Sequence, residues 1–170
     1  MGGTHTNSLF GHNRDQLFLT KIVLGSLRMN PATNPSQVLQ TAKADHEILS
    51  KAIKNFRRVF VGDRPPDAAQ HFAAIQHLLT QKIVEHLTDE ETRVFPALLA
   101  SPRGSTVAPV VTELIQEHIQ LLAEAQRLSG LLQQQSIPQS TGKLWTALLD
   151  YFTVFEKHVI KEDLLFKSFS

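Results

Sequence analysis

Four histidines and two glutamates stand at spacings that would let them meet around metal ions. His86 is followed four residues later by Glu90, and His158 is followed four residues later by Glu162. Four residues advance an α-helix by about 400°, so each histidine and its glutamate share one helical face. His46 and His118 stand 40 residues before His86 and His158, respectively. The chain therefore repeats one pattern twice, a single histidine and then a His-x-x-x-Glu pair.

These residue types favour a centre with two metal ions. Imidazole nitrogens bind divalent iron, zinc, copper or nickel, and carboxylates can bridge two ions. Six ligands are too many for one four-coordinate zinc site. They suit two six-coordinate ions that share Glu90 and Glu162 and leave room for an outside ligand. The alternative is that all six groups are ordinary core-edge residues, but this would bury two carboxylates without partners, which costs several kcal/mol each.

Other polar residues near these positions are assigned weaker roles. On a straight helix, Glu91 and Asp163 lie about 140° away from the histidine five residues before them, although a π-bulge could turn Asp163 inward. Glu47 and Glu117 flank candidate ligands, and either accept the outer imidazole proton or are solvated. Four histidines are expected to take no part: His77 on the opposite helical face, His71 near the bundle end, and His5 and His12 near the N-terminus.

Four amphipathic helical patterns are expected to position the ligands. They run from Pro35, with Asn34 as N-cap, to about Val61, and then over about 67–99, 107–132 and 141–167. Pro96 is expected to kink or end the second helix. Long amphipathic helices joined by short Pro/Gly turns predict an all-α, up-down-up-down four-helix bundle over residues 35–168. Residues 1–34 are interpreted as an N-terminal extension or strap.

Composition excludes several other classes of protein. The 170 residues suffice for one domain, and the absence of cysteine excludes disulfides, thiolate zinc sites and iron–sulfur clusters. A net charge of +1 gives no case for nucleic-acid binding. We find neither a signal peptide nor an apolar run long enough to span a membrane, so no membrane partner is expected and the predicted location is cytoplasmic. A homodimer is left open.

The ordered ligand set resembles the hemerythrin-like (HHE cation-binding) domains over about residues 36–167. The matching segments are Asp45-His46-Glu47, His86-x-x-x-Glu90 with Val94-Phe95-Pro96, Glu117-His118, and His158-x-x-x-Glu162 with Phe166. This resemblance implies a bundle that holds two iron ions, bridged by Glu90, Glu162 and a solvent-derived oxo or hydroxo group. Ferritin-like di-iron bundles instead use Glu-x-x-His pairs.

Within this family, the sequence is most similar to the branch with four histidine and two glutamate ligands. Oxygen-carrying hemerythrins usually add a histidine four residues before the third-helix ligand, where this chain has Leu114, and use a His-x-x-x-x-Asp spacing that His158 and Asp163 retain. The four-His branch contains bacterial di-iron proteins that repair oxidative or nitrosative damage to iron centres. Those proteins often carry a cysteine-bearing N-terminal domain, and this chain has no cysteine.

The resemblance implies a non-haem di-iron protein that binds or reacts with oxygen, peroxide or nitric oxide. Its expected setting is bacterial stress defence or iron-centre repair, and the position left open at Leu114 would admit the small ligand. The alternative is a non-catalytic oxygen or iron sensor, or an iron-binding module, that acts through a partner. Whether the protein is an enzyme is left open.

Overall fold

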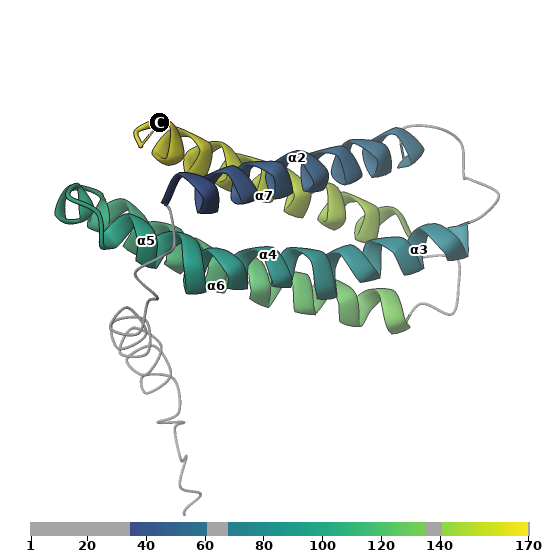
Figure 1. The fold of residues 1–170 in the computed structure, drawn as a ribbon. Coiled ribbons are helices and arrows are strands. Elements are labelled where there is room, and N and C mark those ends of the chain that lie inside the picture. Colours follow the sequence, from purple (N-terminus) through teal and green to yellow (C-terminus); the bar gives the residue numbers. More distant parts are fainter. Residues whose placement is uncertain (1–34, 61–67, 135–140, 170) are drawn as a thin grey trace, which may run out of the picture.

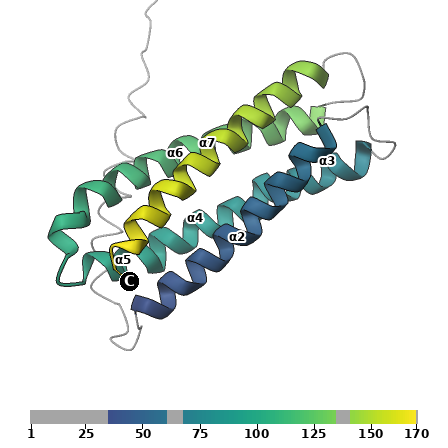
Figure 2. The same ribbon diagram turned by 90° about the horizontal axis from the view of Figure 1, so that it is seen from above.

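Four antiparallel helical rods make up the part of the chain that the computed structural model describes, residues 35–60, 68–134 and 141–169 (Figure 1). The first rod is α2 (Pro35–Phe60), the third is α6 (Gly104–Gln134) and the fourth is α7 (Thr141–Lys167). The second rod runs through α3 (Ala68–His77), η1 (Leu78–Lys82), α4 (Ile83–Asp89), η2 (Glu90–Val94) and α5 (Phe95–Leu99). Each rod packs against two neighbours, which confirms the predicted all-α bundle (Figure 2).

Most helix ends lie within a few residues of their predicted positions. The last helix spans the predicted range, and α2 is described as far as Phe60, while the predicted end at Val61 lies outside the described residues. The third rod begins three residues earlier than predicted, at Gly104, immediately after a tight turn. At Gly104 an added Cβ would lie 1.9 Å from the carbonyl oxygen of Leu99, so only glycine fits this turn. The expected strap over residues 1–34, with His5, His12 and the N-cap Asn34, lies outside the described residues.

Two π-helical segments, η1 and η2, interrupt the second rod, where the sequence predicted a plain α-helix. The Ile83 N–H donates to the Leu78 carbonyl and the Phe95 N–H donates to the Glu90 carbonyl, five residues back in each case. The chain keeps its helical course through Pro96, which was expected to kink or end the helix. Proline has no N–H to donate, and η2 is the helical turn immediately before it.

The core consists of two apolar clusters that are separated by a layer of buried polar side chains. The larger cluster includes Leu49, Ile83 and Phe155, and the smaller one includes Phe95, Leu114 and Phe166. Between the two clusters lie the buried histidines and glutamates described below. Among the described helices, none combines the length and apolar character of a membrane span.

Candidate metal centre

All four rods contribute side chains to the buried polar layer, and these are the six residues predicted from the sequence. They form two overlapping groups that share Glu90 and Glu162, one with His46 and His86 and the other with His118 and His158. Within each group the potential ligand atoms lie within 4.8 Å of one another. None of the six side chains is more than 5% exposed. The fold thus brings the whole predicted set together, from helices far apart in the sequence.

Glu162 lies between the two pairs of imidazoles. Its Oε1 atom is 3.0 Å from Nε2 of His158 and 3.3 Å from Nε2 of His118. Its Oε2 atom is 3.3 Å from Nε2 of His46. Because one oxygen faces each pair, this carboxylate has the geometry of a bridge between two ion positions.

Glu90, on the second rod, also lies between the two pairs of imidazoles. Its Oε1 atom lies 3.2 Å from Nε2 of His46, and its Oε2 atom lies 3.5 Å from Nε2 of His86 and 3.6 Å from Nε2 of His118. All four imidazoles therefore turn their Nε2 atoms toward the two carboxylates. The Nε2 atoms of His118 and His158 are 3.0 Å apart, which brings two lone-pair donors together.

Three further carboxylates hold the outer nitrogens of three imidazoles. The Nδ1 atom of His118 lies 3.0 Å from Glu91, that of His158 lies 2.7 Å from Glu117, and that of His46 lies 2.9 Å from Asp163. An N–H donated from Nδ1 to a carboxylate leaves the Nε2 lone pair free for a metal. Lys161 donates in turn to Glu117, over 2.5 Å.

The outer carboxylates correct two predictions and confirm a third. Glu91 is buried and pairs with His118, because the π-helical turn at η2 removes the regular 100° step on which its outward placement was based. Asp163 stays outside the ligand group, as expected for a straight helix, because α7 is regular there. Glu117 pairs with His158 on the neighbouring helix rather than with the adjacent His118. Glu47 is exposed, as one of its two predicted roles required.

Glu91 is the functional residue that the sequence interpretation missed. One signal for it was present, since Pro96 removes a backbone donor near the end of the second helix and thereby weakens the regular hydrogen-bond ladder. Thr92 also donates its hydroxyl to the carbonyl of Thr88, over 2.7 Å. Such local bonds compete with regular helix pairing.

Aromatic rings enclose the imidazoles and keep water away from them. Phe166 stacks on His46 with ring centroids 5.7 Å apart, and Phe95 stacks on His118 at 5.4 Å. Phe155 lies 6.1 Å from His86 and 6.4 Å from His158. All three phenylalanines are buried. Electrostatic interactions in such an enclosure are much stronger than they would be in water.

Two of the imidazoles carry strongly raised pKa values in the absence of metal. Burial alone would lower the pKa of His46, but hydrogen bonds with Glu162, Glu90 and Asp163 outweigh it and raise the pKa to about 10. Burial likewise opposes protonation of His118, and its bonds with Glu162 and Glu91 raise its pKa to about 9. At neutral pH both rings are therefore protonated. Their positive charges interact with the same carboxylates that a bound cation would.

The pKa values of His86, Glu90 and Glu162 are shifted in different directions. Burial lowers the pKa of His86 to about 3, so that this imidazole is neutral. Burial and the neighbouring Glu162 raise the pKa of Glu90 well above its ordinary value. Burial would do the same to Glu162, but hydrogen bonds from three imidazoles hold its pKa well below the ordinary value. Such divergent pKa values are typical of functional sites.

Three buried atoms of the centre lack a hydrogen bond of regular geometry, although imidazole nitrogens or carboxylate oxygens lie 3.3–3.6 Å from them. They are Nε2 of His86 and the Oε2 atoms of Glu90 and Glu162. Leaving buried polar atoms unpaired costs about 1–3 kcal/mol each, so a folded chain keeps them only where something else satisfies them. A cation among the six side chains would accept lone pairs from all three atoms. The donor set therefore fits a metal.

The other residues singled out by the sequence lie apart from this centre. His77 is exposed, as predicted, and His71 is half-buried toward the α3 end of the second rod. Leu114 is fully buried in the smaller apolar cluster, one helical turn before His118. Beside the centre it presents only an apolar surface.

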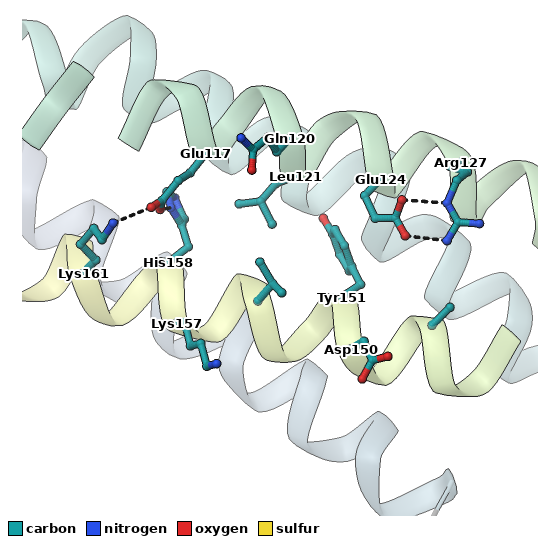
Figure 3. Close-up of a pocket in the computed structure, with 12 residues that line it drawn as sticks. Glu117, Gln120, Leu121, Glu124, Arg127, Asp150, Tyr151, Lys157, His158 and Lys161 are labelled. Carbon is teal, nitrogen blue, oxygen red and sulfur yellow. Dashed lines mark hydrogen bonds and ion pairs between the residues drawn. The ribbon is translucent and has the colours of Figure 1, made fainter. Parts of the chain in front are cut away.

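Surface grooves reach the rim of the centre at three of the imidazoles. A groove of about 660 Å³ between α6 and α7 includes His158 at one end, next to the Glu117–Lys161 pair (Figure 3). A second groove, of about 600 Å³, lies between α2 and α7 and includes His46. A third, of about 350 Å³, includes His86. At each groove the imidazole forms part of the wall, although its side chain is at most 5% exposed.

The comparisons with known proteins give one match. The model of the hemerythrin HHE cation-binding domain matches residues 37–169, which include all six clustered side chains. No match was found among curated proteins or among solved structures.

Proposed function

This chain belongs to the hemerythrin HHE cation-binding domain family, and from that premise we propose that it holds two iron ions and binds or reacts with oxygen, peroxide or nitric oxide. The observation that carries the proposal is the pair of ligand groups that share Glu90 and Glu162. One ion would be held by His46 and His86, the other by His118 and His158, and both carboxylates would bridge. Each ion then has four protein ligands and keeps coordination positions for an outside molecule.

The charges around the centre support two cations rather than one. Glu90 and Glu162 lie among the imidazoles, and Glu91, Glu117 and Asp163 accept from their outer nitrogens. Five carboxylates in so small a volume repel one another unless cations neutralise them, and two divalent ions supply four positive charges. Mixed imidazole and carboxylate ligands suit iron, which supplies reversible one-electron chemistry when bound.

The residues around the centre supply orientation and the exclusion of water. The outer carboxylates fix each ring and its tautomer, while Phe95, Phe155 and Phe166 exclude water from the inner side. Leu114 offers neither a ligand atom nor a hydrogen bond next to His118. We propose that this apolar side accommodates the small ligand, because a diatomic molecule needs space without competing donors.

Metal analysis and spectroscopy of protein produced with iron test this proposal. We expect two irons per chain, magnetically coupled in the Mössbauer spectrum, and a ligand-to-iron absorption band in the near ultraviolet. Glu90→Gln and Glu162→Gln should each lose iron and lower the melting temperature of the iron-loaded protein. A single metal per chain, or zinc at full occupancy, would contradict the di-iron assignment.

His77→Ala is the matched control. Its side chain is exposed and lies outside the centre, so both iron content and melting temperature should stay at the wild-type values. Similar losses in all three variants would contradict the proposed ligand set.

We also propose that the protein acts in bacterial oxidative or nitrosative stress defence, or in the repair of iron centres. The alternative is a non-catalytic oxygen or iron sensor, or an iron-binding module, that signals to a partner. The rates at which the reduced, iron-loaded protein consumes oxygen, peroxide and nitric oxide distinguish the two. Turnover of one of these molecules supports the first function, and stoichiometric binding without turnover supports the second.

A further inference from the structure

The groove between α2 and α7 is strongly basic. Along α2, Lys43, Lys51, Lys54 and Arg58 line it, and Lys167 lines it from α7. Only two acidic side chains, Glu47 and Asp163, also line it. We call this set of seven charged residues the basic groove. The whole chain carries a net charge of only +1, so positive charge is concentrated here.

Most cations elsewhere on the described surface have a carboxylate partner, and those of the basic groove mostly do not. Ion pairs involve Arg57, Lys82, Arg93, Arg127 and Lys161. By contrast, Lys51, Lys54, Arg58 and Lys167 form no ion pair with any described residue. Like charges along one helix face are mutually destabilising. An anionic partner would relieve this repulsion.

The basic groove lies next to the metal centre. Asp163, which lines the groove, accepts from Nδ1 of His46 over 2.9 Å. The side chain of Asp163 is 39% exposed, whereas that of His46 is 4% exposed. One hydrogen bond therefore connects a proposed metal ligand to a side chain that a docked molecule can approach.

The shape of the basic groove indicates the kind of anion. Its cations on α2 run from Lys43 to Arg58, which is about 22 Å along a helix. Lys51, Lys54, Arg58 and Lys167 are all exposed at the surface. A compact anion would be held by converging, buried donors. A long row of exposed lysine and arginine side chains is instead complementary to an acidic protein surface.

We propose that the basic groove docks an acidic electron-transfer protein, which delivers single electrons to the metal centre beside His46. The electron-transfer part rests on the proposed di-iron function. In each transfer the partner's flavin or iron–sulfur cofactor is oxidised by one electron and one iron ion is reduced by one. The docking itself depends only on the surface, so it can be measured without metal.

Binding of two acidic probe proteins, a flavodoxin and a plant-type ferredoxin, tests the proposal by calorimetry. We expect the metal-free and the iron-loaded protein to bind at least one probe at low salt. Affinity should fall about tenfold or more between about 20 and about 200 mM NaCl. The double variant Lys51→Glu/Lys54→Glu should weaken binding by about tenfold or more. It should also slow reduction of the iron-loaded protein by the reduced probe.

The control is Lys143→Glu/Lys157→Glu. Both lysines are exposed, form no ion pair with a described residue and lie outside the basic groove, so this variant changes the net charge by the same amount. It should alter the probe affinity by about twofold or less. Equal weakening by both variants would overturn the proposal.

Failure of both acidic probes to bind would also overturn it. So would preferential binding of duplex DNA, anionic lipid vesicles or pyrophosphate that depends on Lys51 and Lys54, since each would identify another kind of partner. The two proposals fail separately. A protein with two irons and no probe binding refutes the docking surface, whereas probe binding by a chain that holds no iron refutes the di-iron function and the electron-transfer step, and leaves the docking surface supported.

Discussion

The outer carboxylates determine which nitrogen of each imidazole faces the centre. Glu91, Glu117 and Asp163 come from three different rods, and each accepts from Nδ1 of a histidine on another rod. Each ring is thereby fixed from both sides, by a bridging carboxylate at Nε2 and by an outer carboxylate at Nδ1. His46, His118 and His158 are thus oriented before any metal arrives.

Removal of one outer carboxylate should weaken metal binding without abolishing it. Glu91→Gln and Glu117→Gln keep the shape of the side chain but lose its charge, and we expect about 10–100-fold lower iron affinity in each. Competition with a chelator measures the change. Glu47→Gln is the control, because Glu47 is exposed and outside the centre, and its affinity should match that of the wild type. If Glu47→Gln weakens binding as much, the orienting role of Glu91 and Glu117 is refuted.

Metal affinity should rise with pH between about 6 and about 9. Without metal, His46 and His118 hold protons up to pKa values of about 10 and about 9. Iron binds only the neutral rings, so it must expel these protons, and the expulsion becomes easier as pH rises. Calorimetry in buffers of different ionisation enthalpy measures the protons released. Proton release below one per chain at pH 7 would contradict the raised pKa values.

The same two protons determine how the metal-free protein responds to alkali. Both folded-state pKa values lie above the ordinary histidine value of about 6.5. Their contribution to stability is therefore fully present below about pH 6.5 and is lost as pH rises through about 9 and 10. Iron-loaded protein should lack this loss, because its rings are already neutral.

At the scale of the helices, amphipathic spacing predicts the rods and the inward faces well. His86 and Glu90 lie on one face, as predicted, because the turn between them belongs to the regular helix α4 and η2 begins only at Glu90. Regular helical spacing alone does not give the position of Glu91, because one π-helical turn changes the rotation of every residue after it. Pro96 and Thr92 are local signals that the regular period is weakened there, but they do not determine which residues turn inward.

Hydrogen-bonded pairs between residues on different helices also cannot be predicted from sequence spacing. Glu117 stands next to His118 in the chain, yet its carboxylate binds His158 on α7. This pair is 41 residues apart in the chain, and the two residues meet because α6 packs against α7. The clustering of the six side chains was therefore predictable, whereas the assignment of each outer carboxylate to its ring was not.

Two glycines of α6 should respond in opposite ways to alanine. Gly104→Ala places a Cβ 1.9 Å from the Leu99 carbonyl oxygen, and relief of that clash requires a shift of the turn between α5 and α6. We expect a loss of about 2 kcal/mol or more in the free energy of unfolding. Gly130→Ala has open space around it and should gain about 0.5–1 kcal/mol from helix propensity.

Urea unfolding of the two metal-free variants measures both effects. If Gly104→Ala is as stable as the wild type, the close approach of the turn to Leu99 is not a constraint. If Gly130→Ala is less stable than the wild type, the space around Gly130 is not open enough for an added methyl group.

At the scale of the molecule, the centre connects all four rods. His46 comes from α2, His86 and Glu90 from the second rod, His118 from α6, and His158 and Glu162 from α7. Separation of any one rod from the bundle would therefore remove at least one of the six side chains from the centre. Metal binding and global folding are therefore expected to be coupled.

Removal of iron with a chelator should lower the melting temperature by on the order of 10 °C. At free metal about 100-fold above its dissociation constant, each bound ion contributes about 2.7 kcal/mol, and a bundle of this size converts two such contributions into a shift of that order. Differential scanning calorimetry measures it as a function of free iron. A melting temperature independent of iron would show that the ligands do not bind metal in the folded state.

The repeat among the six clustered side chains has a consequence for the symmetry of the bundle. Residues 35–99 supply His46, His86 and Glu90, and residues 104–167 supply His118, His158 and Glu162. Each half is a helical hairpin that offers two imidazoles and one carboxylate, and neither half surrounds an ion by itself. Two identical copies of one hairpin would present the same donors as the whole chain. The bundle therefore has the internal pseudo-twofold symmetry that two copies of one hairpin, paired around the centre, would have.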